Sequence, residues 1–249
     1  GDLNDAEITK AQSLIKSYKM QVSCISRHNF AGMLVGDTEV GDENYNRHMD
    51  GLQNCIDMAL ELDTNVVRIM SFRREMILFG SMGADHWVTS TGAWDKLLKL
   101  LELPVKLAEE KNINLVLETG NNAMVPSAWL GKKLINDIGS DRLRILWDPA
   151  NSLYANEPTY PDGWEALKDG YIGHFHIKDA KVNMAHAHVE FCEMGKGDMA
   201  PYLDPLANEM KLNNYNGYIS LESVYRPEGG SFEDGYRASL PKFKELFDW

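Results

Sequence analysis

Positive charge and long apolar runs are both scarce in this sequence of 249 residues, and each shortage excludes a class of partner. The 25 lysines and arginines are outnumbered by 37 aspartates and glutamates, which gives a net charge of −12. A protein of this charge repels a phosphate backbone, so we expect no nucleic-acid partner. No apolar run reaches the roughly 18–20 residues that a membrane span needs, so we expect no membrane partner.

Cysteine is also scarce. Cys24, Cys55 and Cys192 are far apart in the sequence and form no CxxC pair. This spacing argues against a disulfide framework and against a thiolate zinc site. Reduced thiols suit the cytoplasm, where we expect the protein to be located.

Helical and strand-like segments alternate along the chain. Six segments have the composition of strands: residues 20–26, 65–72, 113–120, 143–148, 171–179 and 215–223. A connection long enough to contain a helix follows each of them, and such a series predicts a parallel sheet. Strands that are apolar on both faces favour a barrel or a doubly wound sheet. No linker or low-complexity tract divides the chain, so we predict a single domain over residues 1–249.

Four of these segments carry an acid or a histidine near their carboxyl end, where an aliphatic residue is usual. These residues are Glu118, Asp148, His176 and Glu222. Because side chains alternate across a strand, His174, His176 and Lys178 share one face of their segment. In a barrel such faces can point inward, at the end of the barrel where active sites lie.

Converging carboxylates repel one another unless a cation lies between them. Three carboxylates with one imidazole form an oxygen-rich ligand set, which suits Mn²⁺, Mg²⁺ or Co²⁺ better than a structural zinc. Each residue taken alone also fits a plainer role, as a helix cap, an exposed loop charge or a hydrogen-bonded core histidine. The recurrence at the same place on four strands supports a site for a divalent metal ion, with Zn²⁺ as a further candidate, while the residue pattern alone leaves both interpretations open.

Several motifs together resemble the xylose-isomerase-like superfamily of sugar isomerases and epimerases. They are "LELDTNVVRI", "NINLVLETGN", "ILWDPAN", "IGHFHIKD", "GKGDMAPYLDPL" and "NYNGYISLE", and they extend over most of the chain. The resemblance implies a TIM-type (β/α) barrel. It also implies that Glu118, Asp148, His176 and Glu222 bind one divalent metal, and that Glu118 and Glu222 are the acid/base pair of an enzyme acting on a keto sugar or sugar phosphate.

The substrate-binding candidates are Lys178, Asn151, Arg226 and His28. Asn151 stands three residues after Asp148, where ketose epimerases of this type commonly have a histidine. An asparagine can hydrogen-bond a hydroxyl but is a poor acid or base, so the motif is more similar to branches that handle other sugars or sugar phosphates. Arg226 and His28 are each either a substrate contact or a solvated loop residue. Residues 185–198, with two histidines and a cysteine, fit a loop over the pocket better than a zinc motif.

The resembling barrels have eight strands, whereas six are visible in this sequence. Because the metal-binding strands of the family are the fifth to eighth, the resemblance implies that the first two strands are missing at the N-terminus. An open barrel exposes sheet edges that promote association, and a homo-oligomer is one way to cover them.

Three other functions stay open. A lyase that dehydrates a cyclic polyol ketone or a dehydroshikimate-like keto acid can use the same metal site. An endonuclease-IV-like phosphodiesterase needs more histidines and a more basic surface than this sequence has. A non-catalytic sugar-binding protein is the third alternative.

Overall fold

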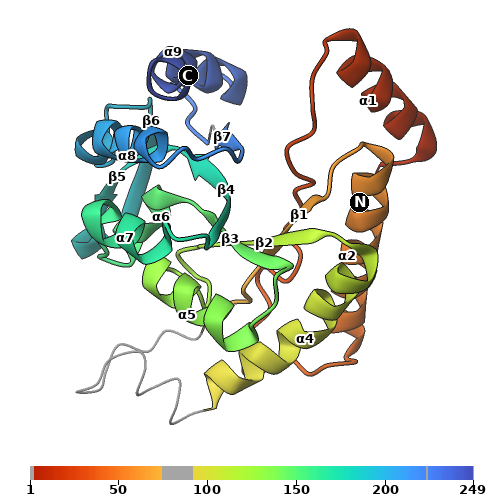
Figure 1. The fold of residues 1–249 in the computed structure, drawn as a ribbon. Coiled ribbons are helices and arrows are strands. Elements are labelled where there is room, and N and C mark those ends of the chain that lie inside the picture. Colours follow the sequence, from red (N-terminus) through yellow and green to blue (C-terminus); the bar gives the residue numbers. More distant parts are fainter. Residues whose placement is uncertain (1–2, 75–91, 223, 249) are drawn as a thin grey trace. The chain divides into compact units, whose positions relative to one another are not determined.

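The computed structural model describes residues 3–74, 92–222 and 224–248 (Figure 1). Contacts within the chain divide it into two compact units. The first consists of residues 1–118, 122–125 and 134–144, and the second of residues 119–121, 126–133 and 145–249. Among the described residues, no helix combines the length and the apolar character that crossing a bilayer requires.

The first unit is built from helices packed on parallel strands. Its helices are α1 (Asp5–Ser17), α2 (Glu43–Glu61) and α4 (Ala93–Lys111), and its strands are β1 (Val66–Met70) and β2 (Asn114–Glu118). β1 and β2 pair in parallel, with Val67 level with Leu115 and Met70 level with Glu118. Helices α2 and α4 contact each other, α2 contacts β1, and α4 contacts β2 (Figure 1).

Helical spacing of apolar residues explains this packing. Leu52, Cys55, Ile56 and Ala59 recur on one face of α2, and all four are fully buried. A helix with such a stripe buries it against a neighbouring element, which here is β1 and α4.

The segment at residues 20–26 differs from the expectation of a full strand. Only Ile25 joins the sheet, where it forms an isolated parallel bridge with Val67. The Ile25 amide donates to the Val66 carbonyl at 2.9 Å, and the Arg68 amide donates to the Ile25 carbonyl at 2.9 Å. Ile25 is buried while Gln21 and Ser26 are exposed, so this segment has too little apolar surface to extend the pairing.

Two elements are divided between the units, namely α5 (Ala128–Ile138) and β3 (Leu143–Trp147). The second unit otherwise contains the strands β4 (Ile172–Ile177) and β7 (Ile219–Leu221). Its helices are α6 (Pro149–Tyr154), α7 (Trp164–Leu167), α8 (Ala200–Leu212) and α9 (Phe232–Phe247), with a π-helical turn η1 (Thr159–Gly163) and a 3₁₀ turn η2 (Met184–His186). Helix α9 contacts both α8 and β7.

The main sheet has the strand order β1-β2-β3-β4-β7. β3 pairs in parallel with β4, and β4 pairs in parallel with β7. Helices separate these strands along the chain, so the prediction of an α/β fold with a parallel sheet is confirmed. Parallel strands place their carboxyl ends on the same edge of a sheet, and this edge of the second unit carries the polar residues discussed below.

Part of residues 185–198, expected to form a loop, is instead one strand of a hairpin. β5 (Asp179–Asn183) pairs in antiparallel fashion with β6 (His188–Cys192), with Val182 level with Val189. The turn between them is η2, after which Ala187 has a positive φ of 49°. The two strands of a hairpin are neighbours in the sequence, so a short turn such as η2 is enough to bring them together.

Candidate functional site

Strand β4 presents His174, His176 and the following Lys178 in alternation. His174 is buried, and its Nε2 lies 2.8 Å from the Ser220 hydroxyl of β7. In the pairing of β4 with β7, His176 is level with Ser220 and Ile177 with Leu221. Because His174 contacts Ser220, which is level with His176, His174 and His176 share one face of the sheet. The contact gives His174 a structural role.

The pairing of β3 with β4 contains a register shift. Ile145 is level with Ile172, but the next residue, Leu146, is level with His174. Gly173 is therefore the extra residue of a bulge in β4. When this register is continued, Asp148 comes level with His176 and points to the same side of the sheet. Without the bulge Asp148 would be level with Phe175, on the opposite face.

Lys178 connects two carboxylates in the second unit. Its ammonium nitrogen lies 2.7 Å from Glu222 Oε2 and also forms an ion pair with Asp148 Oδ2. Asp148 is fully buried and only 9% of the Lys178 side chain is exposed. Burial alone lowers the pKa of Lys178, but the two neighbouring carboxylates outweigh it and raise the pKa above its usual value.

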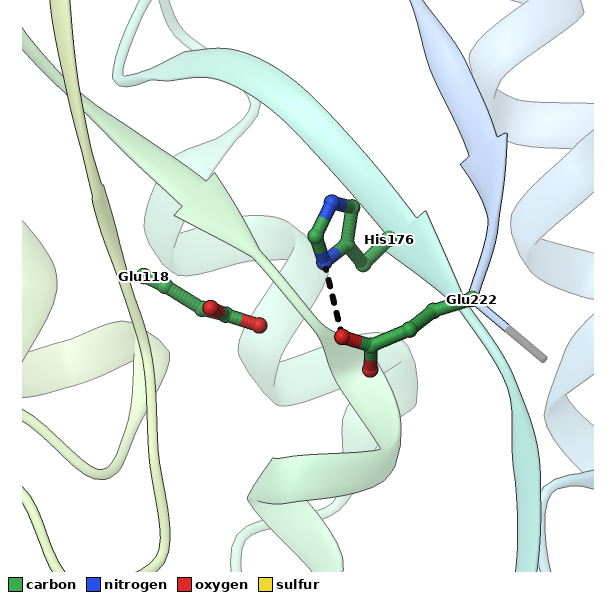
Figure 2. A group of neighbouring side chains, drawn as sticks. All are labelled: Glu118, His176 and Glu222. Carbon is green, nitrogen blue, oxygen red and sulfur yellow. Dashed lines mark ion pairs between the residues drawn. The ribbon is translucent and has the colours of Figure 1, made fainter. Parts of the chain in front are cut away.

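His176 and Glu222 form the second pair of this cluster (Figure 2). His176 Nδ1 lies 3.4 Å from Glu222 Oε1. Burial raises the pKa of Glu222, but His176 and Lys178 together lower it well below its usual value. The Glu222 carboxylate is therefore ionised at neutral pH.

Both oxygens of Asp148 are already hydrogen-bonded. Asp148 caps the N-terminus of α6, where its Oδ1 accepts from the Ala150 amide at 3.1 Å. Its Oδ2 accepts from the Asn151 side-chain amide at 3.1 Å, in addition to Lys178. The same Asn151 amide donates to the Thr119 carbonyl at 2.7 Å, which fixes Asn151 beside Asp148.

Glu118, the fourth expected ligand, is the last residue of β2 in the first unit (Figure 2). Its Oε2 lies 2.6 Å from Arg68 Nη1 of β1, and both side chains are buried. This ion pair explains why a strand as apolar as β1 has an arginine at its centre.

The two remaining substrate-binding candidates lie on loops. His28 is exposed in the first unit. Arg226 is exposed on the loop after β7, where its guanidinium lies 5.9 Å from the centre of the Phe232 ring. Neither side chain is part of the cluster in the second unit, which consists of Asp148, Asn151, His176, Lys178 and Glu222.

Asp179, immediately after Lys178, has a role that the sequence analysis missed. Its buried carboxylate accepts four backbone hydrogen bonds, from Ala180 at 2.8 Å, Gly195 at 2.8 Å, Gly197 at 2.9 Å and Met199 at 3.0 Å. A carboxylate directed at a glycine-rich turn is the signal that could have revealed it. Asp179 thus ties the end of β4 to the loop before α8.

The cluster in the second unit fits a divalent ion. Asp148 and Glu222 offer carboxylate oxygens and His176 offers a ring nitrogen, a ligand set that suits Mn²⁺, Mg²⁺ or Co²⁺. Two ligands at right angles around an octahedral ion, each about 2.1 Å away, are about 3.0 Å apart. The 3.4 Å between His176 Nδ1 and Glu222 Oε1 is close to that spacing, so the pair needs little rearrangement to share an ion.

Comparison with known proteins agrees with this fold. The model of the xylose isomerase-like TIM barrel family matches residues 1–246. No protein of curated function matches the sequence.

Three solved structures illustrate the likeness. The 3-keto-D-glucoside 4-epimerase YcjR from E. coli is 17% identical, with a TM-score of 0.70 over 96% of this chain and 85% of that one. The probable 3-DHS dehydratase AsbF from Bacillus anthracis is 13% identical, with a TM-score of 0.70 over 96% and 82%. The IolI protein, solved with a binding zinc atom, is 13% identical, with a TM-score of 0.65 over 97% and 82%.

Proposed function

Because this chain belongs to the xylose isomerase-like TIM barrel family, we propose that it is a divalent-metal-dependent isomerase or epimerase of a keto sugar or its phosphate. The observation that carries the proposal is the cluster of Asp148, His176 and Glu222 at the carboxyl ends of β3, β4 and β7. Active sites of barrels lie at this end of the strands. The keto-glucoside epimerase among the structural matches supports the choice of substrate class.

Asp148, His176 and Glu222 would hold the metal, with Glu118 as the fourth ligand. A bound divalent ion polarises a substrate carbonyl and thereby acidifies the neighbouring C–H bond. The zinc in the IolI structure supports a metal on this fold. Because a single family model matches residues 1–246, we propose that residues 1–249 act as one domain in this reaction.

We assign Glu222 as one member of the acid/base pair. His176 and Lys178 hold its pKa below the usual value, so the carboxylate is ionised at the pH of the cell. We assign Glu118 as the other member of the acid/base pair. Return of the proton to the opposite face of the same carbon gives an epimer. Return to the neighbouring carbon, with transfer of the hydroxyl proton from one oxygen to the other, gives an isomer. Such transfers contribute roughly 10²–10⁴-fold to a rate.

Lys178 and Asn151 are the side chains that we assign to substrate oxygens. Both contact Asp148, so a sugar hydroxyl near that carboxylate lies within their reach. Arg226 and His28 stay as candidates for the outer part of the substrate, where a phosphate or a distal hydroxyl is bound.

Exchange of substrate hydrogen with solvent tests the proposal directly. The Mn²⁺-loaded protein is incubated in D₂O with a panel of keto sugars and sugar phosphates, and deuterium at the carbon next to the carbonyl is followed by proton NMR. We expect exchange with at least one substrate, accompanied by a new epimer or isomer, and a loss of about 10²-fold or more in Glu222→Gln. Binding of a sugar without exchange in any member of the panel would favour the non-catalytic alternative.

The dehydratase among the structural matches supports a second candidate, a lyase acting on a cyclic keto acid or polyol ketone. Proton removal next to a carbonyl is common to both reactions. In the lyase a hydroxyl group then leaves, and the product is an enone that absorbs in the ultraviolet. Absorbance growing with the deuterium exchange would assign the lyase, whereas exchange without absorbance assigns the isomerase or epimerase.

A further inference from the structure

Lys178 is bound to two of the residues that we assign to the metal. We propose that Lys178 competes with the divalent ion for Asp148, so that Asp148 binds the ion only after Lys178 has moved away from Asp148. This inference rests on the proposed function, because it takes Asp148 to be a metal ligand. It adds a further role for Lys178, which is to compensate the charge of the metal-free site.

The contacts of Asp148 leave its Oδ2 no free position for an ion. Oδ1 accepts from the Ala150 amide, a backbone donor fixed by α6. Oδ2 accepts from Asn151 and is ion-paired with Lys178. Of these groups, the lysine has the longest and most flexible stem, and it is the one that a second cation repels. Asp148 can therefore reach a metal through Oδ2 only after Lys178 moves.

Glu222 is arranged differently. Its Oε2 contacts Lys178 at 2.7 Å, but its Oε1 faces His176 Nδ1 at 3.4 Å. Glu222 can therefore offer one oxygen to an ion while the other still contacts the lysine. His176 and Glu222 can therefore bind a metal without displacing Lys178, whereas Asp148 can bind it only after Lys178 is displaced.

A displaced ammonium has a favourable neighbour within reach. Lys178 Nζ lies 5.8 Å from the centre of the Phe191 ring on β6, within the range of a cation–π contact. Phe191 is partly exposed, so a lysine that shifts toward this ring gains access to water. The released ammonium then becomes available to a substrate oxygen.

Metal affinity tests the inference without any substrate. The dissociation constant for Mn²⁺ is measured by titration calorimetry for the parent protein and for Lys178→Met. The control is Lys181→Met, which removes the same charge from an exposed position on β5. We expect Lys178→Met to bind Mn²⁺ at least about tenfold more tightly than the parent, and the control to bind it like the parent. In an Asp148→Asn background, the gain from Lys178→Met should disappear.

The outcomes separate this inference from the proposed function. If the parent binds Mn²⁺ and Lys178→Met binds it equally or less tightly, the competition is refuted while the metal site stands. If neither protein binds Mn²⁺, both the inference and the metal-dependent function are refuted.

A second measurement needs only the parent chain, so it tests the inference even if the Lys178→Met variant does not fold. The protein is treated briefly with acetic anhydride, with and without Mn²⁺, and acetylation of each lysine is quantified by mass spectrometry. We expect Mn²⁺ to increase the acetylation of Lys178 several-fold and to leave Lys181 unchanged. Unchanged or slower acetylation of Lys178, at a Mn²⁺ concentration that saturates the site, would refute the displacement.

Discussion

Two arginine–glutamate pairs with the same separation allow the effect of burial on an ion pair to be measured within this one protein. Arg68 Nη1 lies 2.6 Å from Glu118 Oε2, and 5% and 6% of the two side chains are exposed. Arg237 Nη2 lies 2.6 Å from Glu233 Oε1 on α9, and there 72% and 69% are exposed. The perturbation that we consider is the replacement of each arginine by methionine, which has a similar length and no charge.

The two substitutions should have very different costs. Arg68→Met leaves the buried carboxylate of Glu118 without its arginine, and breaking a buried pair in this way costs about 3–5 kcal/mol. Arg237→Met removes a pair that water already screens, so we expect a cost of at most about 1 kcal/mol. The difference of about 2–5 kcal/mol reflects the desolvation of a single carboxylate.

Urea unfolding followed by circular dichroism, with a chelator present, measures both free energies of unfolding. Hydrogen exchange of the peptides that contain β1 and β2 locates the loss of stability in the first unit. The double variant Arg68→Met/Glu118→Met removes both charges, and we expect it to be more stable than Arg68→Met alone. If Arg68→Met costs no more than Arg237→Met, or if the double variant is the less stable of the two, the reasoning is wrong.

Three further predictions concern the second unit. Replacing Asp179 by Asn should cost about 2–4 kcal/mol of unfolding free energy, because an amide cannot accept all four backbone hydrogen bonds. The control Asp204→Asn, on the exposed surface, should cost little. Urea unfolding of the two variants measures both costs. The parent, loaded with Mn²⁺ and desalted, should retain about one ion per chain by plasma mass spectrometry, and His176→Ala should retain none. The lowered pKa of Glu222 contributes stability that is present above its ordinary value of 4.5 and is lost as the pH falls below it. Urea unfolding measured across that range should therefore show a steeper acid loss for the parent than for Glu222→Gln, and equal slopes would contradict the assignment.

The fold was largely predictable from local patterns. Five of the six expected strands are present as β1, β2, β3, β4 and β7, because runs of buried aliphatic residues between helical segments leave few alternatives to a parallel sheet. Residues 20–26 fell short because pairing with β1 required more than one apolar contact. The hairpin of β5 and β6 was missed because its turn contains neither Gly nor Pro, and Ala187 adopts a positive φ that its residue type does not announce.

The candidate site, like the fold, was only partly predictable from the sequence. Sequence alone identified the acids and the histidine at the strand ends, since charged residues in an apolar strand stand out without any three-dimensional information. Only the tertiary structure decided how they combine. The bulge at Gly173 brings Asp148 level with His176, and a register shift of this kind depends on packing between strands that are distant in sequence. Lys178 was identified from the sequence, but its ion pairs with Asp148 and Glu222 were not. These ion pairs require three groups from different elements to meet in space.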